Sequence, residues 1–127
     1  QKLINHFSKN IHKNKIRLSH IKIESSRVSP FVLLPGDPGR VKRIGEKLND
    51  FRIEAENREF VVGSGRYRNI PVSVCSAGVG APSTAIAVEE LIAAGAKVLI
   101  RVGTCGGAWR KDIPLGSLVI PTASIRD

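Results

Sequence analysis

Short apolar runs separated by glycine and proline fill the chain from about residue 31 onward, and they predict strands alternating with helices. Phe31–Leu34 is an apolar run of the kind that forms a short strand. Residues 41–50 carry apolar side chains at helical spacing and predict a helix. Residues 58–78 predict two antiparallel strands joined by a turn region at Gly63–Asn69.

The next part of the chain predicts a helix and then a strand. A glycine-rich turn at residues 78–80 leads into a helix for which Pro82 is a suitable first-turn residue. Residues 98–102 place four apolar side chains around Arg101 and predict a strand buried on both faces. Residues 111–124 predict a turn and a further strand. This order of strand, helix and strand indicates an α/β sheet with helices packed on it.

The net charge of +9 at pH 7 raises the question of a nucleic-acid partner. Much of the excess lies at the front, where Lys2, Lys9, Lys13, Lys15 and Arg17 lie in the stretch before the first acid, Glu24. That stretch shows no helical period and no aromatic residues interleaved with basic ones, as stacking on single-stranded nucleic acid requires. We interpret it as a solvated basic extension. No apolar run is long enough to span a bilayer, so neither nucleic acid nor a membrane is an expected partner.

The two cysteines indicate the redox state of the cellular compartment. Cys75 and Cys105 stand alone in apolar or glycine-rich contexts, which is neither a disulfide framework nor a metal-ligand spacing. A reducing, cytoplasmic location is therefore expected, and no bound metal. The chain begins with Gln1 rather than methionine, so we expect its natural N-terminus to lie further upstream.

Three glycine turns follow predicted strands, at residues 36–40, 78–80 and 103–107. In open α/β sheets, ligands bind outside the carboxyl ends of the strands, and glycine N–H groups there can hold oxyanions. Arg40 and Arg101 stand beside two of these turns and can bond phosphate with both guanidinium nitrogens. Each arginine alone is more often a structural ion-pair residue, but together they predict a phosphate site. No triphosphate or dinucleotide loop pattern is present.

Four sequence blocks carry a resemblance to a known family: PGDPGRV (35–41), REF (58–60), GVGAPSTAIAVEEL (78–91) and RVGTCGG (101–107). Their order and spacing resemble the nucleoside phosphorylase family of uridine phosphorylase and hexameric purine nucleoside phosphorylase. The resemblance runs from about residue 20 to the end and covers only the N-terminal half of such enzymes. It implies an α/β fold, a three-layer α/β/α sandwich around a mixed, twisted sheet. We expect a basic extension at residues 1–19 and half of a phosphorylase domain at residues 20–127.

The resemblance assigns a phosphate site. Gly36 and Arg40 match the turn that holds phosphate through backbone N–H and guanidinium groups. Arg101 and Thr104 match the strand-end pair that contacts phosphate and approaches the ribose, with Arg101 as the catalytic residue. Asp37 is expected to be structural, because a free carboxylate beside phosphate opposes binding.

The resemblance also implies sites shared between subunits. Arg58 matches an arginine supplied to the neighbouring subunit's phosphate site, and His20 a histidine that reaches across the same interface to the ribose 5′-hydroxyl. Cys105 and Gly106 match positions that line the nucleobase pocket. A homo-oligomer, in particular a hexamer, is the expected assembly.

The activity that the resemblance implies is phosphorolysis of a nucleoside to free base and ribose 1-phosphate. Phosphate is the nucleophile and co-substrate, so no other cofactor is needed. Ser83 and Thr84 are then expected to be helix-start residues, and Cys75 a core residue. Uridine is the favoured substrate, with a purine nucleoside or methylthioadenosine as the alternative. A non-catalytic anion- or RNA-binding fragment is the alternative of another class. The isolated 127-residue chain is expected to be incomplete for catalysis.

Overall fold

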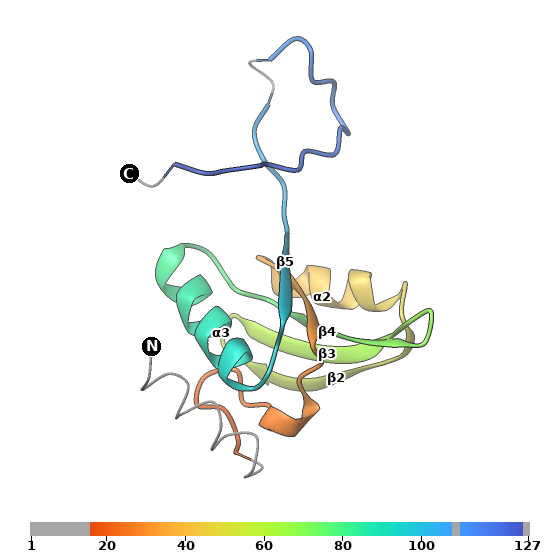
Figure 1. Cartoon of the computed structure of the whole chain (residues 1–127), viewed down its shortest axis with the longest axis vertical. Helices are drawn as coiled ribbons and strands as arrows, with labels where there is room; N and C mark the ends of the chain where they lie inside the picture. Colours follow the sequence, from red (N-terminus) through yellow and green to blue (C-terminus); the bar gives the residue numbers. More distant parts are fainter. Residues whose placement is uncertain (1–15, 108–109, 126–127) are drawn as a thin grey trace.

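The computed structural model describes residues 16–107 and 110–125 (Figure 1). Its elements, in chain order, are the 3-10 turn η1 (Ser25–Arg27), β1 (Phe31–Pro35), α2 (Pro38–Gly45), β2 (Asn49–Asn57), β3 (Phe60–Tyr67), β4 (Ile70–Cys75), α3 (Ala81–Ala93) and β5 (Val98–Val102). The strands form one five-stranded sheet in the order β2-β3-β4-β1-β5. β1 pairs in parallel with β4 and β5, whereas β3 pairs antiparallel with β2 and β4. The sheet is therefore mixed, as expected.

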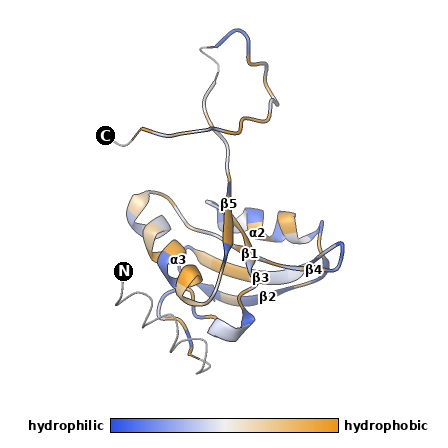
Figure 2. Ribbon diagram, viewed as in Figure 1, coloured by the Kyte–Doolittle hydropathy of each residue, from blue (hydrophilic) through white to orange (hydrophobic). Residues whose placement is uncertain are grey.

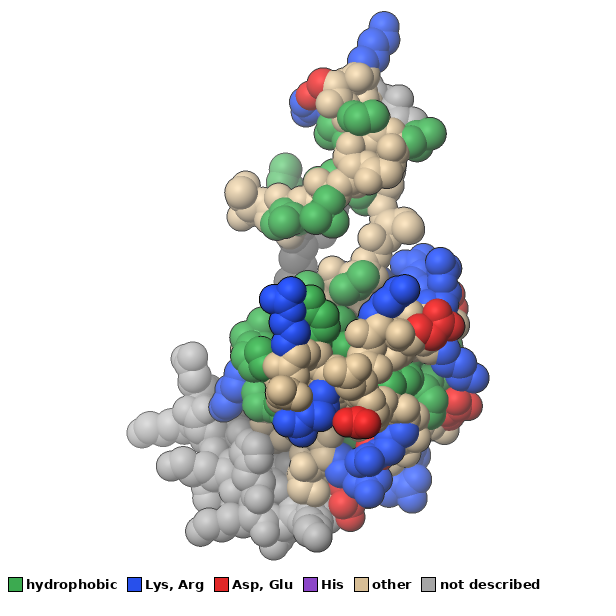
Figure 3. All heavy atoms as spheres, turned by 90° about the vertical axis from the view of Figure 1, so that its right-hand side faces the viewer, with side chains coloured by type: hydrophobic (Ala, Val, Ile, Leu, Met, Phe, Trp, Pro, Cys, Tyr) green, Lys and Arg blue, Asp and Glu red, His purple; other side chains and the backbone are tan. Residues whose placement is uncertain are grey.

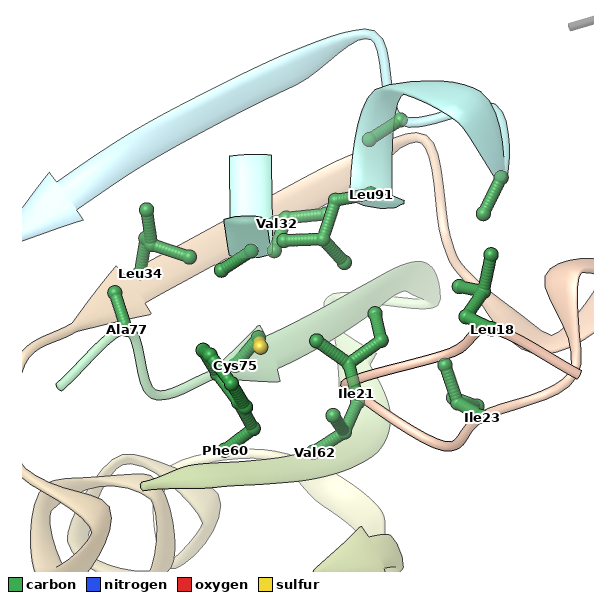
Figure 4. Close-up of a cluster of buried hydrophobic side chains, with 13 residues drawn as sticks. Leu18, Ile21, Ile23, Val32, Leu34, Phe60, Val62, Cys75, Ala77 and Leu91 are labelled. Carbon is green, nitrogen blue, oxygen red and sulfur yellow. The ribbon is translucent and has the colours of Figure 1, made fainter. Parts of the chain in front are cut away.

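The two helices cover opposite faces of the sheet, because alternate residues of a strand point to opposite sides. Val32 and Leu34 of β1 lie in the core cluster that also contains Leu91 of α3 (Figure 4). Leu33, between them, packs on the other face against the cluster that contains Val41 of α2. This arrangement gives the predicted three layers.

The core extends to the N-terminal side of residue 20. Leu18, Ile21 and Ile23 belong to the α3-side cluster and are almost completely buried. Figure 4 shows Ile21 beside Val62 of β3, with Leu18 and Ile23 further out on the same side. Packed residues thus include part of the stretch expected as a basic extension, whereas residues 1–15 lie outside the described part.

The helix expected over residues 41–50 is present but shifted toward the N-terminus. α2 begins earlier, at Pro38, because the Asp37 carboxylate accepts a hydrogen bond of 3.0 Å from Gly39 N–H and caps the first turn. It ends at Gly45, and Asn49 and Asp50 already belong to β2.

The turn between β3 and β4 is also narrower than expected. It consists of Arg68 and Asn69, both with positive φ, as a two-residue hairpin requires. Gly63 lies inside β3, where a Cβ atom would come within 2.3 Å of Phe51. The glycine serves packing rather than the turn.

Two expectations about the C-terminal part were wrong. β5 is an edge strand, and four of its five residues are exposed, although Figure 2 shows hydrophobic colouring along it. Residues 110–125 contain no strand among those described and run away from the sheet. Leu115, Leu118 and Ile120 are at least 79% exposed, and hydrophobic side chains mark this arm in Figure 3. A strand needs a partner for its backbone groups, and this segment pairs with no described strand.

Candidate phosphate site

Three strand ends meet at one edge of the sheet. β1 ends before Gly36, β4 leads into Gly78, and β5 ends before Gly103. Because both neighbours of β1 run parallel to it, the three following turns surround a hollow of about 690 Å³. Its lining residues are Gly36, Asp37, Pro38, Arg40, Glu59, Gly78, Val79, Gly80, Arg101, Gly103 and Thr104. Sequence reasoning placed a ligand at this edge of the sheet.

The turns after β1 and β4 are tied together by backbone hydrogen bonds. Ala77 N–H donates to the Pro35 carbonyl and Gly78 N–H to the Gly36 carbonyl, both at 2.9 Å. A Cβ atom on Gly36 would lie 2.9 Å from Arg101 Nη2 and 3.3 Å from the Gly78 carbonyl oxygen. Gly36 therefore allows the guanidinium to lie against the backbone of the turn.

Arg101 is bonded to backbone and to no acid among the described residues. Its Nη1 atom donates a hydrogen bond of 2.9 Å to the Leu34 carbonyl oxygen. No described carboxylate forms a salt bridge with Arg101 or with Arg40. The structural ion-pair interpretation of these two arginines thus finds no partner in the described chain. Arg101 is exposed at the sheet edge, so the burial expected for its strand is not found here.

Arg40 stands in the first turn of α2, where the helix dipole favours anions, but the N–H groups of Gly39 and Arg40 already bond Asp37. Asp37 lines the same hollow, but its carboxylate accepts the capping bond from Gly39, so the structural role expected for it is confirmed. Glu59 is the lining carboxylate that sequence reasoning missed. Its one sequence signal is its place in the REF block, directly after Arg58.

The other sequence-predicted residues lie outside this hollow. Cys105 and Gly106 follow Thr104 and are exposed. His20 and Arg58 lie near each other, because the Asn57 side-chain amide donates a hydrogen bond of 2.7 Å to the His20 carbonyl and Arg58 follows Asn57 in the chain. Both are exposed. The structure thus groups Gly36, Arg40, Arg101 and Thr104 in one place and the pair His20 and Arg58 in another.

The hydroxyl groups near the start of α3 donate hydrogen bonds to backbone carbonyls. Ser83 Oγ donates to the Val79 carbonyl at 3.0 Å, and Thr84 Oγ1 to the Gly80 carbonyl at 3.0 Å. Both are helix-start residues, as predicted. Cys75 is fully buried, and burial together with the charge of Glu90 raises the pKa of its thiol to about 12, so it is a core residue.

Residues 16–107 and 110–125 contain no group of three or more His, Cys, Asp or Glu side chains that could hold a metal ion. No helix in the same part of the chain is long and apolar enough to cross a membrane.

Comparison with known proteins decides the family. A sequence model of the phosphorylase superfamily matches residues 30–127. The chain belongs to this superfamily. All the residues that line the hollow fall within the matched segment, including Arg40 and Arg101.

Named phosphorylase superfamily relatives include enzymes for both classes of base. The chain is 46% identical over 107 residues to uridine phosphorylase of Thermococcus kodakarensis, and this match covers 84% of this chain and 38% of the relative. It is 39% identical over 108 residues to guanosine phosphorylase of Halorubrum lacusprofundi, and this match covers 85% of this chain and 44% of the relative. The crystal structure of purine nucleoside phosphorylase from Toxoplasma gondii in complex with immucillin-H matches with a TM-score of 0.76 and 37% identity, over 81% of this chain and 41% of that one. The chain therefore spans about two fifths of the length of these superfamily members.

Proposed function

We propose that the protein carrying this chain catalyses phosphorolysis of a nucleoside, with inorganic phosphate as nucleophile. One observation carries the proposal: Arg40 and Arg101, neither with an ion-pair partner among the described residues, converge with Gly36 and Thr104 at the strand ends of a phosphorylase-superfamily fold. Two guanidinium groups suit a phosphate dianion.

The proposed reaction needs positioning more than it needs a protein nucleophile. A phosphate oxygen attacks C1′ of the ribose, the C1′–N bond breaks, and its electron pair leaves with the base, which takes up a proton. Arg101 and Arg40 hold the dianion below C1′, and the Thr104 hydroxyl lies at the ribose side of the phosphate. Orientation and fixed positive charge of this kind are large contributions to catalysis. No cofactor is required, because phosphate itself is the co-substrate.

The site is proposed to be shared between subunits. His20 and Arg58 sit together on the surface and do not line this chain's own hollow. In an oligomer they are placed to enter a neighbour's site, His20 at the ribose 5′-hydroxyl and Arg58 at the phosphate. A hexamer is the proposed assembly. Sedimentation of the full-length protein as an active monomer would contradict it.

Uridine is the proposed substrate, with purine nucleosides or methylthioadenosine as the second candidate. Uridine phosphorylases recur among the relatives with 36–47% identity, but guanosine and purine nucleoside phosphorylases are among them too. Cys105 and Gly106 are proposed to line the base pocket. The proposed location is the cytoplasm, in keeping with two free cysteines.

A direct test follows base release by the full-length protein from uridine, guanosine, inosine and methylthioadenosine, with and without phosphate. The expected result is release that requires phosphate and yields ribose 1-phosphate. Phosphate-independent release of free ribose would indicate a hydrolase and overturn the proposal. Titration with tRNA tests the non-catalytic alternative, and tight binding without turnover of any nucleoside would favour it.

A further inference from the structure

His20 lies at the tip of a hairpin that is packed into the core. Residues 16–24 form a small hairpin in which Leu18 N–H donates a hydrogen bond of 2.9 Å to the Ile23 carbonyl. Leu18, Ile21 and Ile23 are buried in the α3-side core cluster. The imidazole of His20, at the tip of this hairpin, remains 49% exposed. A well-packed segment thus presents one accessible histidine.

The carboxylate of Glu90, on α3, holds this tip through three donors. It accepts hydrogen bonds from His20 N–H at 2.8 Å and from Ile21 N–H at 3.0 Å. Its Oε1 atom also lies 2.5 Å from His20 Nδ1. The Glu90 side chain is only 15% exposed, so little water competes for these contacts. On the other side of the tip, Asn57 donates to the His20 carbonyl.

These contacts determine which nitrogen of the ring carries the proton. An ionised carboxylate only accepts hydrogen bonds, so the Nδ1 atom beside Glu90 must be the donor. In the neutral imidazole the other nitrogen, Nε2, is then an unprotonated acceptor. No contact of Nε2 with the described residues uses this lone pair.

We propose that Glu90 is a positioning residue: it fixes the Nδ1–H tautomer and the ring orientation of His20, so that Nε2 accepts a hydrogen bond from a sugar hydroxyl of the nucleoside. The proposal rests on the proposed function, in which His20 reaches the ribose 5′-hydroxyl in a neighbouring subunit. Glu90 has no contact with the substrate and acts only through the histidine.

The tautomer can be measured without any assay of activity. In the full-length protein, the ¹⁵N chemical shifts of the His20 imidazole, assigned with the His20→Ala variant, should report Nδ1–H in the neutral ring. In Glu90→Gln the two backbone N–H groups take the amide oxygen and turn the amide NH₂ toward Nδ1. The neutral ring should then shift to the Nε2–H tautomer. Glu89→Gln is the matched control, because Glu89 is exposed on the same helix turn, and it should keep Nδ1–H. An unchanged tautomer in Glu90→Gln overturns the inference.

Kinetics with two substrates test the consequence. Loss of one hydrogen bond predicts a KM for uridine that is about 3- to 10-fold higher in Glu90→Gln. With 5′-deoxyuridine, which lacks the hydroxyl, Glu90→Gln and the unmodified protein should have the same KM. Equal impairment with both substrates would mean a merely structural role and would overturn the inference.

The His20→Ala variant separates this inference from the proposed function. It should raise the KM for uridine at least as much as Glu90→Gln does. If it leaves that KM unchanged, the sugar contact is overturned whatever tautomer the spectra report. If no nucleoside is turned over at all, the proposed function fails, and a tautomer shift would still show that Glu90 sets the protonation of His20.

Discussion

Arg101 and Leu34 are register partners in the parallel pair of β5 and β1, and Arg101 Nη1 donates a hydrogen bond of 2.9 Å to the Leu34 carbonyl oxygen. The bond holds the guanidinium over the end of β1, where Nη2 lies beside Gly36. One nitrogen of the fork is thus anchored on the backbone, and no hydrogen bond to a described residue uses the remaining N–H groups, which can hold an anion. This division explains how an arginine can be oriented without a carboxylate that would compete with phosphate.

Replacement of Arg101 tests this division of roles. Arg101→Ala in the full-length protein should weaken phosphate binding and slow turnover, because loss of a charge-assisted contact costs about 1.5–3 kcal/mol, or one to two decades. Arg101→Lys should also be impaired, since a point charge cannot replace the fork. The measurements are phosphate saturation kinetics and the melting temperature on the same preparation.

A matched control for Arg101 exists on β3. Arg66 is also exposed and also donates to a backbone carbonyl, that of Asn69, at 2.7 Å. Arg66→Ala should leave the phosphate kinetics unchanged. A loss of thermal stability in Arg101→Ala with unaltered phosphate kinetics would sink the phosphate-site interpretation.

Gly36→Ala should act on phosphate binding through Arg101. The new Cβ atom would lie 2.9 Å from Nη2 and 3.3 Å from the Gly78 carbonyl oxygen, so the guanidinium must move. We expect a phosphate KM raised by about tenfold, comparable to losing one charged hydrogen bond. In the double variant with Arg101→Ala the two effects should not add, because both remove the same contact. Additive effects would show that the alanine disturbs the turn by another route.

Local sequence patterns predicted those parts of the fold that local chemistry determines. β1 and α3 follow from an apolar run and from helix-start and helix-stop residues. β2 was missed, although the alternation of apolar and charged side chains in Asn49–Asn57 is itself a strand pattern. The strand expected in residues 111–124 does not form. Its apolar run of Leu118, Val119 and Ile120 is real, but pairing depends on another strand, which a local pattern does not contain.

The candidate site likewise has residues that local sequence predicts and residues that only tertiary packing brings in. Gly36, Arg40, Arg101 and Thr104 could be predicted because each stands at the end of a strand, in the turn that follows it, or in the helix start beside that turn. Glu59 reaches the hollow only through the β2–β3 hairpin. Glu90 meets His20 across 70 residues of sequence. Contacts of this range depend on tertiary packing, so no spacing in the sequence marks them.

The Glu54 cluster predicts a stability change at acid pH. The Glu54 side chain is 2% exposed and accepts hydrogen bonds from Arg27 and Arg52, each at 2.6 Å, and from Ser64 at 2.5 Å. Burial would raise the pKa of this carboxyl, but the hydrogen bonds from Ser64 and Arg52 and the charges of both arginines outweigh it, so the pKa lies below its ordinary 4.5. A lowered pKa stabilises the fold above the ordinary value, and this contribution is lost as the pH falls through the lowered one.

Glu54→Gln should accordingly lower the free energy of unfolding at pH 7 by about 1.5–3 kcal/mol, the range for hydrogen bonds to a charged group. The difference from the unmodified protein should shrink below pH 4.5 as Glu54 itself is protonated. Urea unfolding of the full-length protein between pH 7 and pH 3 measures it. Glu56→Gln is the control, because its contact with Lys42 is exposed and 3.9 Å long. A Glu54→Gln difference that is constant across this pH range would contradict the assignment.

The two cysteines should differ in reactivity, and only one should respond to substrate. Thiolate is the reactive form, and at pH 8 a thiol with a pKa of about 12 is ionised in about one molecule in ten thousand. Cys75 is fully buried as well, so iodoacetamide should leave it unmodified in the native full-length protein and alkylate it after unfolding. Cys105 is exposed and should be alkylated.

Because Cys105 is proposed to line the base pocket, saturating uridine together with phosphate should slow its alkylation, whereas phosphate alone should have less effect. Peptide mapping by mass spectrometry reads both sites in one sample, and Cys75 after unfolding serves as the internal control. Equal alkylation of Cys105 with and without nucleoside would remove it from the base pocket.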